Sequence, residues 1–180
     1  SVARAEQVGN ILTIRWYDIA TRKVIREMKD LKNVWAGPLM AQEWITLTYS
    51  DGWLRRFRLS DNKLLWEIRL GDEKLASATE SADGSLVAAS TDSRTGYLVR
   101  IENNVPRLVR RFPDAGSLTV SDDGKRIYAS YRQVRAFDTA SLGSTIEKRL
   151  PNFLGAISHL KATDDLWAYN SNLVTGGHEE

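Results

Sequence analysis

The sequence repeats one hairpin-like pattern at intervals of about 40 residues. A copy at residues 51–71 reads DGWLRRFRLSDNKLLWEIRLG, in which two alternating stretches flank a polar turn. Aligned copies have an aromatic or aliphatic anchor at Tyr17, Phe57, Ile101 and Phe137, with spacings of 40, 44 and 36 residues. Alternation with period two predicts strands, and a repeat of this length is typical of four-stranded β units that stack on one another.

A second hairpin precedes each anchor. Residues 81–90, SADGSLVAAS, and 121–130, SDDGKRIYAS, both place an Asp-Gly turn before a strand, because glycine accepts the positive φ that such a turn needs. One unit then comprises strands near 117–121, 126–130, 134–138 and 145–150. We therefore predict an all-β chain: a β-propeller or propeller segment of about four to five blades, each a four-stranded antiparallel meander. Residues 1–180 form one domain, with approximate blade boundaries at 1–34, 35–71, 72–113, 114–151 and 152–180.

One stretch also fits a helix. Val24, Met28, Leu31 and Trp35 fall at helical spacing with charges between them. The counterparts in the other copies, such as KLLWEIRL, alternate with period two, and repeats should share one secondary structure. The strand is favoured, and a distorted or longer connection near Asp30 to Asn33 is the alternative that stays open.

The overall composition is that of a folded domain. The chain has 42% hydrophobic and 27% charged residues, and 25 basic against 23 acidic residues give a net charge of only +2. That charge does not suggest a nucleic-acid partner. Absence of cysteine excludes disulfides and thiolate metal sites. No run approaches the roughly 18 apolar residues of a membrane helix, so we expect a soluble protein without a membrane span. The compartment stays open: cytoplasmic, or periplasmic or secreted after removal of a signal.

Residues 51–71 resemble the repeat of pyrroloquinoline-quinone-type propellers, with Trp66 matching the tryptophan of the outer strand. Asn62 and Arg22 stand where that repeat usually has glycine, and Trp66 has no tryptophan counterpart in the other copies. SDDGKRIYASYRQVRAFDTAS looks like the blade of surface-layer and lactonase-like propellers, and SADGSLVAAS resembles the second strand of WD40-like blades. The resemblance implies the propeller architecture, in which Trp66 faces a neighbouring blade.

The sequence offers few reactive groups. The histidines are His159, on a predicted inner strand, and His178, in a polar tail, and a nucleophilic triad normally needs a histidine base. Carboxylate pairs occur at Asp72-Glu73, Asp122-Asp123 and Asp164-Asp165. The last two occupy equivalent turns, where they shape hairpins more readily than they bind calcium. We predict no catalytic, metal or cofactor site, and an enzyme is the less favoured class.

Four residues are candidates for partner binding. Arg15, Arg55 and Arg135 each precede an aromatic anchor by two residues, so each guanidinium should share a face with its aromatic. Either the arginine stem packs between blades while its head pairs with a carboxylate or ring, or the three heads form a positive rim for an acidic partner. Trp53, which follows the Asp51-Gly52 turn, is the candidate aromatic anchor.

These features favour a non-catalytic scaffold that mediates protein-protein interaction. The alternative is a lactonase-like or quinoprotein-like enzyme, or a ligand-binding propeller, with its site in the central channel; a third possibility is a structural module of a larger polypeptide. In the repeat frame, three full blades lie between two incomplete ones. We therefore expect completion by a protein partner, by the remaining blades of a longer chain, or by a second copy in a homo-oligomer.

Overall fold

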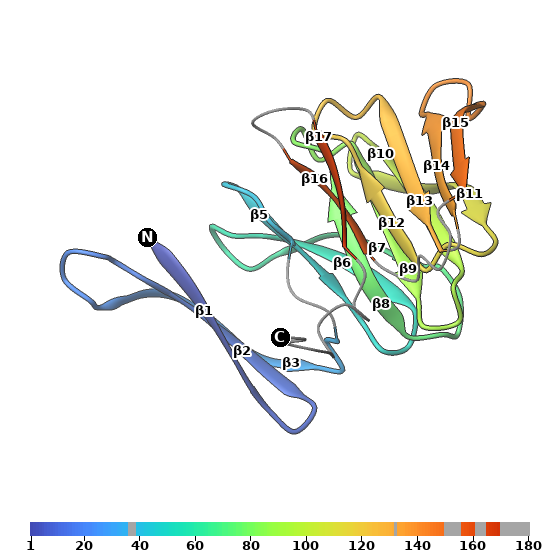
Figure 1. Ribbon diagram of the computed structural model, residues 1–180. Helices are drawn as coiled ribbons and strands as arrows, with labels where there is room; N and C mark the ends of the chain where they lie inside the picture. The colour runs from blue at the N-terminus through green and yellow to red at the C-terminus, as the bar shows by residue number, and fades with distance from the viewer. Residues whose placement is uncertain (36–38, 132, 150–155, 161–164, 170–180) are drawn as a thin grey trace, which may run out of the picture.

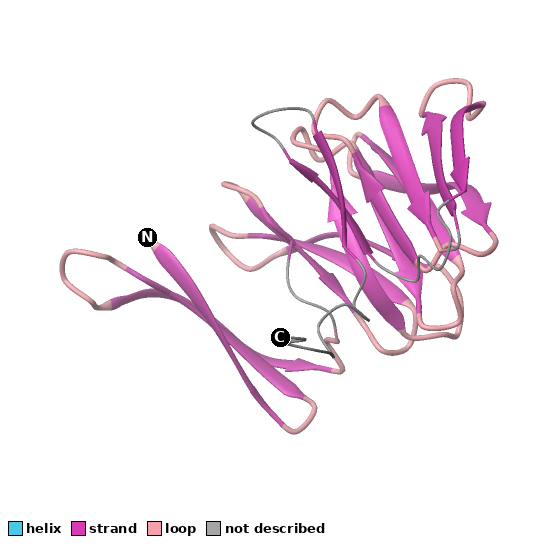
Figure 2. Cartoon of the chain, viewed as in Figure 1, coloured by secondary structure: helices cyan, strands magenta, loops and turns pink. Residues whose placement is uncertain are grey.

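The computed structural model describes residues 1–35, 39–131, 133–149, 156–160 and 165–169. Its regular secondary structure is entirely β, with no helix in the described residues (Figures 1 and 2). No helix in these ranges could therefore cross a membrane. The alternating sequence pattern thus correctly predicts the all-β chain.

The strands form five antiparallel sheets in chain order. The first sheet holds β1 (Val2–Val8), β2 (Ile11–Tyr17) and β3 (Val24–Lys32); the second holds β4 (Leu39–Met40), β5 (Trp44–Thr48), β6 (Trp53–Arg58) and β7 (Leu64–Arg69). The third holds β8 (Leu75–Glu80), β9 (Leu86–Thr91), β10 (Gly96–Glu102) and β11 (Val105–Phe112); the fourth holds β12 (Ser117–Val120), β13 (Arg126–Ser130), β14 (Gln133–Asp138) and β15 (Ser144–Arg149). The fifth holds β16 (Ala156–Leu160) and β17 (Asp165–Tyr169). Each of the first four sheets is a meander, and the second, third and fourth sheets lie side by side (Figure 1).

A register shift at one repeated position defines which residues are equivalent. The pairing of the last two strands shifts just before Tyr17, Phe57, Val99 and Phe137. Val99, not Ile101, is therefore the third anchor, which corrects the sequence alignment by two residues. The cause is the β10-β11 turn, which has only two residues, Asn103 and Asn104, at φ 53° and 60°. Because this turn takes up only two residues, β10 and β11 stay paired up to Glu102 and Val105, whereas the other copies have a longer loop at this point.

The stretch with helical spacing is a strand. β3 pairs with β2, and the register shifts between Leu12 and Ile14. Asp30 and Asn33 have positive φ values of 55° and 62°. The strand is therefore irregular near these two residues, and the repeat pattern overrides the local helical spacing.

The Asp-Gly turns of the third and fourth sheets have the same hydrogen bonds. Asp83 Oδ1 accepts from Ser81 Oγ at 2.7 Å and from Ser85 N at 3.0 Å. Asp123 Oδ1 accepts from Ser121 Oγ at 2.7 Å and from Lys125 N at 2.9 Å. Glycine follows in both turns, with φ near 70°. These carboxylates shape the turns, as the sequence predicts for Asp123.

Where burial is described, up to residue 143, the core has three apolar layers, one between each successive pair of the first four sheets. Trp16 packs with Ile45 and Leu59 between the first and second sheets. Trp66 packs with Val87 and Val99 between the second and third sheets, and is only 4% exposed. The layer between the third and fourth sheets contains Leu86, Leu98, Phe112, Val120 and Phe137. Trp66 thus faces a neighbouring blade, as the resemblance implies.

Candidate functional site

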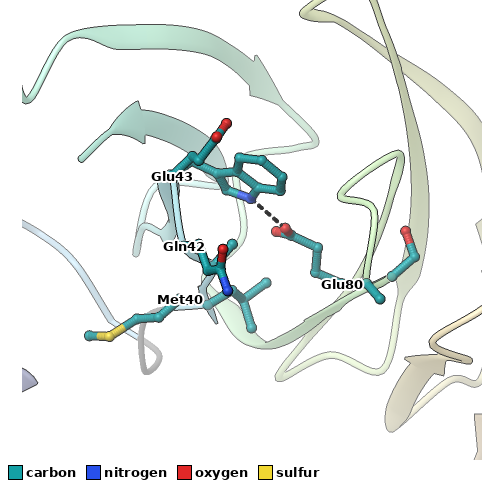
Figure 3. Close-up of a pocket in the computed structure, with 9 residues that line it drawn as sticks. Met40, Gln42, Glu43 and Glu80 are labelled. Atoms are coloured by element: carbon teal, nitrogen blue, oxygen red, sulfur yellow. Dashed lines mark hydrogen bonds between the residues drawn. The ribbon is translucent and has the colours of Figure 1, made fainter. Parts of the chain in front are cut away.

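A pocket opens between the turn that joins β4 to β5 and the end of β8. Figure 3 shows Met40, Gln42 and Glu43 on one side of it and Glu80 on the other. Its volume is about 490 Å³, and the rest of its lining is Leu39, Ala41, Trp44, Ser81 and Ala82. Gln42 and Glu43 are exposed, whereas the Glu80 side chain is only 10% exposed. The pocket therefore has exposed polar side chains at its rim and a buried carboxylate at its base.

Glu80 is held by donors from the neighbouring sheet. Its Oε1 accepts from Trp44 Nε1 at 2.6 Å (Figure 3), and its Oε2 accepts from Thr46 Oγ1 at 2.9 Å. Arg56 Nη2 lies 3.0 Å from Glu80 Oε2, and the two groups form an ion pair. The hydrogen bonds from Trp44 and Thr46, together with this ion pair, orient the carboxylate.

The Arg56 guanidinium is enclosed by its own sheet and the next. Its Nε donates to Thr46 Oγ1 and its Nη1 donates to the Gly84 carbonyl, both at 3.0 Å. Its Cζ lies 5.0 Å from the centroid of the Trp44 ring and 4.8 Å from that of Trp66. Burial lowers the pKa of Arg56, and the attraction of Glu80 only partly opposes this. An arginine keeps its charge despite such a shift, so the base of the pocket is a buried ion pair.

The strand register explains why these groups meet. Thr46 on β5 pairs with Arg56 on β6, and Arg56 pairs with Trp66 on β7. Directly opposed residues of antiparallel strands share a face, so the three side chains form one row across the sheet. The third sheet packs on that face and brings Glu80, the last residue of β8, over the row.

A second pocket of about 530 Å³ lies on the other side of the same turn. It shares Gln42, Glu43 and Trp44 with the first pocket. The rest of its lining comes from three sheets: Arg26, Arg58, Leu59, Ser60, Leu65 and Asn104. The turn that carries Gln42 and Glu43 therefore projects between two hollows.

The arginine column forms pairs within the chain. Arg15 Nε donates to Glu27 Oε1 at 2.7 Å, and Arg55 Nε donates to Glu67 Oε2 at 2.9 Å. In both cases the glutamate is the residue directly opposite on the next strand. The hydrogen bond with Glu27 is the main cause that raises the pKa of Arg15. The repeat thus contains a cross-strand Arg-Glu pair in these two sheets.

Arg135 and Trp53 lie against the core. Arg135 Nη2 donates to the Pro113 carbonyl at 3.0 Å, and its Cζ lies 5.8 Å from the Phe137 centroid. Trp53 is half-buried and packs against the layer between the first and second sheets. The Arg55 Cζ lies 5.2 Å from the Trp53 centroid.

The residues expected from the sequence do not include Trp44 and Glu80, which line the first pocket, or Arg56, which forms an ion pair with Glu80. Trp44, Arg56 and Glu80 have no counterparts of the same type in the other copies of the repeat. A search for repeated positions therefore passes over them. A charged residue at an inward-facing position, as Arg56 is in the alternation of β6, is the signal that could have indicated a buried ion pair.

A few further carboxylates and histidines bear on the prediction that the chain has no catalytic or metal site. In the ranges that the structure describes, no three carboxylate or imidazole side chains gather as metal ligands. Asp72 pairs with Arg69 at 2.6 Å, and Glu73 accepts a hydrogen bond from Ser93. His159 lies on β16 and Asp165 begins β17. Their side chains, together with Asp164 and His178, lie outside the part that is described.

Comparison with known proteins identifies the fold. No protein-family model and no curated sequence matches the chain. Among solved structures, it is similar to the Cps50 (Swd1) β-propeller domain of Myceliophteria thermophila, with a TM-score of 0.63, 10% identity and coverage of 91% of this chain and 76% of that one. The WD40 domain of Toxoplasma gondii coronin gives a TM-score of 0.69, 12% identity and coverage of 89% and 50%. A chain of a mitotic checkpoint complex gives a TM-score of 0.70 and 10% identity, and the match covers 95% of this chain and 58% of that one.

These likenesses show that the architecture is that of a β-propeller. The chain spans half to three quarters of the length of those three structures. At 10 to 12% identity the similarity concerns the fold, and function has to be argued from the side chains of this chain.

Proposed function

We propose that this chain is a non-catalytic propeller scaffold that binds a protein partner, and that the turn carrying Gln42 and Glu43 is the contact surface. The observation that carries the proposal is the arrangement of this turn. Two exposed polar side chains project between two pockets, and the indole beside them is fixed by the buried Glu80. An anchored aromatic beside adaptable polar groups is a favourable composition for a protein interface.

The charge of the chain supports a protein partner over nucleic acid. The net charge is +2, and the ion pairs around the pockets neutralise much of the local charge, since Arg56 is paired with Glu80 and Arg58 with Asp61. Nucleic-acid binding depends on a surplus of unpaired cations.

The predicted partner-binding residues remain a second proposed contact surface. They are Arg15, Arg55, Arg135 and Trp53. The arginine heads would have to exchange a hydrogen-bond partner within the chain for one outside it. That exchange makes this surface the less favoured of the two.

Site-specific photo-crosslinking tests the proposed surface. A photoreactive residue at Gln42 should cross-link one protein from the native cell extract, and Glu43→Arg should reduce the yield. The matched control carries the same photoreactive residue at exposed Asp51, in the turn between β5 and β6 at the other end of the sheet. Equal cross-linking at Gln42 and Asp51, or no effect of Glu43→Arg, would contradict the assignment of the turn.

The enzymatic alternative has its own test. Calcium, other divalent metals and a quinone cofactor are added separately, and the melting temperature is recorded. A lactonase-like or quinoprotein-like site would bind one of them and raise the melting temperature. We expect no shift, and a saturable rise followed by lactone hydrolysis or dye reduction would favour the enzyme.

A further inference from the structure

The second pocket has a guanidinium and a carboxylate in its lining that form no ion pair. Its charged residues are Arg26 of β3, Arg58 of β6 and Glu43 of the β4-β5 turn. Arg58 pairs with Asp61 at 3.2 Å. In the ranges that the structure describes, Arg26 and Glu43 take part in no ion pair, either with each other or with a third residue. The pocket therefore keeps one unpaired positive and one unpaired negative charge.

The strand register directs Arg26 toward this pocket. Arg26 lies directly opposite Trp16 on β2, and directly opposed residues share a face. Trp16 packs in the layer between the first and second sheets, so the half-buried Arg26 also faces the second sheet. Its Cζ lies 5.7 Å from the centroid of the Trp16 ring. Asn62 Nδ2 of the β6-β7 turn donates to the carbonyl of the neighbouring Glu27 at 3.1 Å, and this hydrogen bond holds the turn against β3.

Glu43 is fixed beside an apolar surface. The Leu59 backbone N–H donates to the Glu43 carbonyl at 2.8 Å, and the Leu59 side chain is buried. Leu65 and Trp44, both half-buried, add further apolar area to the lining. Neutral hydrogen-bonding side chains complete it: Gln42, Ser60 and Asn104. A hollow of about 530 Å³ with apolar walls and a few polar groups has the size and composition of a small-molecule site.

The two unpaired charges favour a ligand that is itself a zwitterion. A simple anion would pair with Arg26 but would bring a like charge close to Glu43, and a simple cation would do the reverse. Both effects are stronger at a partly buried site than in bulk water, because the effective dielectric constant is lower there. An α-amino acid has an ammonium group and a carboxylate on the same carbon. It can therefore match both charges of the pocket without adding net charge.

We propose that the second pocket binds a free α-amino acid with an aliphatic side chain. The Arg26 guanidinium pairs with the carboxylate of the ligand, Glu43 accepts hydrogen bonds from its ammonium group, and its side chain packs on Leu59 and Leu65. Removal of that aliphatic side chain from water supplies the apolar part of the affinity. This site requires no protein partner. It is tested on the purified chain, so this proposal and the proposed contact surface can fail independently.

Calorimetry with leucine and two truncated analogues tests the zwitterion. L-Leucine should bind saturably. 4-Methylpentanoate, which is leucine without its amine, and 3-methylbutylamine, which is leucine without its carboxylate, should each bind about tenfold more weakly, because each leaves one charge of the pocket unpaired. Glycine should also bind more weakly than leucine, because it has no aliphatic group. No binding of leucine, or equal affinity for leucine and either analogue, would overturn the proposal.

Two substitutions test which side chain binds which end of the ligand. Arg26→Gln should weaken leucine about tenfold but bind 3-methylbutylamine no more weakly than the unmodified chain does. Glu43→Gln should likewise weaken leucine but not 4-methylpentanoate. Because each variant must retain its affinity for one analogue, misfolding cannot produce this pattern. Arg111→Gln, an exposed change on β11 outside the pocket, is the control that should leave all affinities unchanged. Equal weakening of all three ligands in either variant would overturn the assignment.

Discussion

The interface between the second and third sheets and the interface between the third and fourth sheets use the same positions with opposite chemistry. The strand registers and the equivalent turns relate four positions across the two interfaces. At the first interface they hold Trp44, Thr46, Arg56 and Glu80; at the second they hold Leu86, Ala88, Leu98 and Val120. The first four form the ionic network under the pocket, and the second four belong to one apolar layer.

The difference shows that the repeat tolerates a buried ion pair where it does not need one for folding. The four apolar residues pack the equivalent positions of the second interface without any charged side chain. A buried pair must overcome the cost of removing both charges from water, so it contributes little net stability, although loss of one partner is costly. What the ionic set adds is a fixed position of the Trp44 indole and the Glu80 carboxylate at the pocket.

The largest expected effect comes from removing one charge of the pair. Glu80→Leu should lower the free energy of unfolding by about 3 to 5 kcal/mol, because it leaves Arg56 buried without a counter-ion. The double variant Arg56→Leu/Glu80→Val, which copies the apolar interface, should recover most of that loss. Chemical denaturation measures both. A double variant as unstable as Glu80→Leu would mean that the two interfaces are not interchangeable.

Trp66 tests whether the apolar parts of the two interfaces are equally strong. Trp66→Ala should cost about 3 to 5 kcal/mol, the usual cost of emptying a buried aromatic site. Phe112, which is 1% exposed in the layer between the third and fourth sheets, provides the matched variant, and Phe112→Ala should cost a similar amount in chemical denaturation. A loss below about 1 kcal/mol at Trp66 alone would assign the cohesion of the first interface to its charges.

The two turn glycines sharpen the comparison at the pocket itself. Gly84 and Gly124 have φ values of 70° and 69°, and alanine in this region costs about 1 to 2 kcal/mol. A Cβ at Gly84 would lie 2.5 Å from Trp44 Cζ2, whereas a Cβ at Gly124 would meet nothing closer than 3.6 Å. Gly84→Ala should therefore cost about 2 to 4 kcal/mol because overpacking adds to strain. Equal losses in thermal melts would show that the Trp44 ring can move.

Arg55 lies next to Arg56 but on the opposite face, and its substitution should have a smaller effect. Arg55→Met should change stability by less than about 1 kcal/mol, because the pair with Glu67 is partly exposed and the stem supplies most of the packing. Arg55→Ala should lose more than Arg55→Met when both are unfolded with denaturant. If both variants lose the same amount, the charge contributes more than the stem, and the positive rim becomes the better account.

The loss of stability at acid pH should differ least between the two interfaces, because their Asp-Gly turns have the same hydrogen bonds. Burial tends to raise the pKa of Asp83, but hydrogen bonds from Ser81 and Ser85 outweigh it and the pKa is lowered. The hydrogen bond from Ser121 is the main cause that lowers the pKa of Asp123. A lowered folded-state pKa gives stability that is present above the ordinary value of 3.8 and is lost as the pH falls through the folded value.

Unfolding measured from about pH 5 down to about pH 2 checks this point. Asp83→Asn and Asp123→Asn should each reduce the acid-dependent loss by a similar amount, since each removes one titrating group with the same hydrogen-bond pattern. A much larger effect at Asp83 would mean that its turn responds to the nearby ion pair.

Most of the architecture could be predicted from the sequence. The anchors Tyr17, Phe57 and Phe137 are placed correctly because the strand period and the long loops beside them repeat together. The assignment of Ile101 is wrong because the two-residue turn at Asn103-Asn104 keeps the hydrophobic alternation while it shifts the register by two. A period-two pattern cannot detect such a shift, since residues two apart lie on the same face.

The sequence by itself determined the strands, the turns and the repeat, because alternation and glycine at positive φ act over a few neighbouring residues. Only the tertiary structure decided what happens to Arg56. Its neighbour Arg55 forms a partly exposed pair with Glu67, whereas Arg56 is buried against Glu80 of another sheet. Burial and pairing of charges depend on which sheets stack and in which register, and these are set by contacts between distant segments.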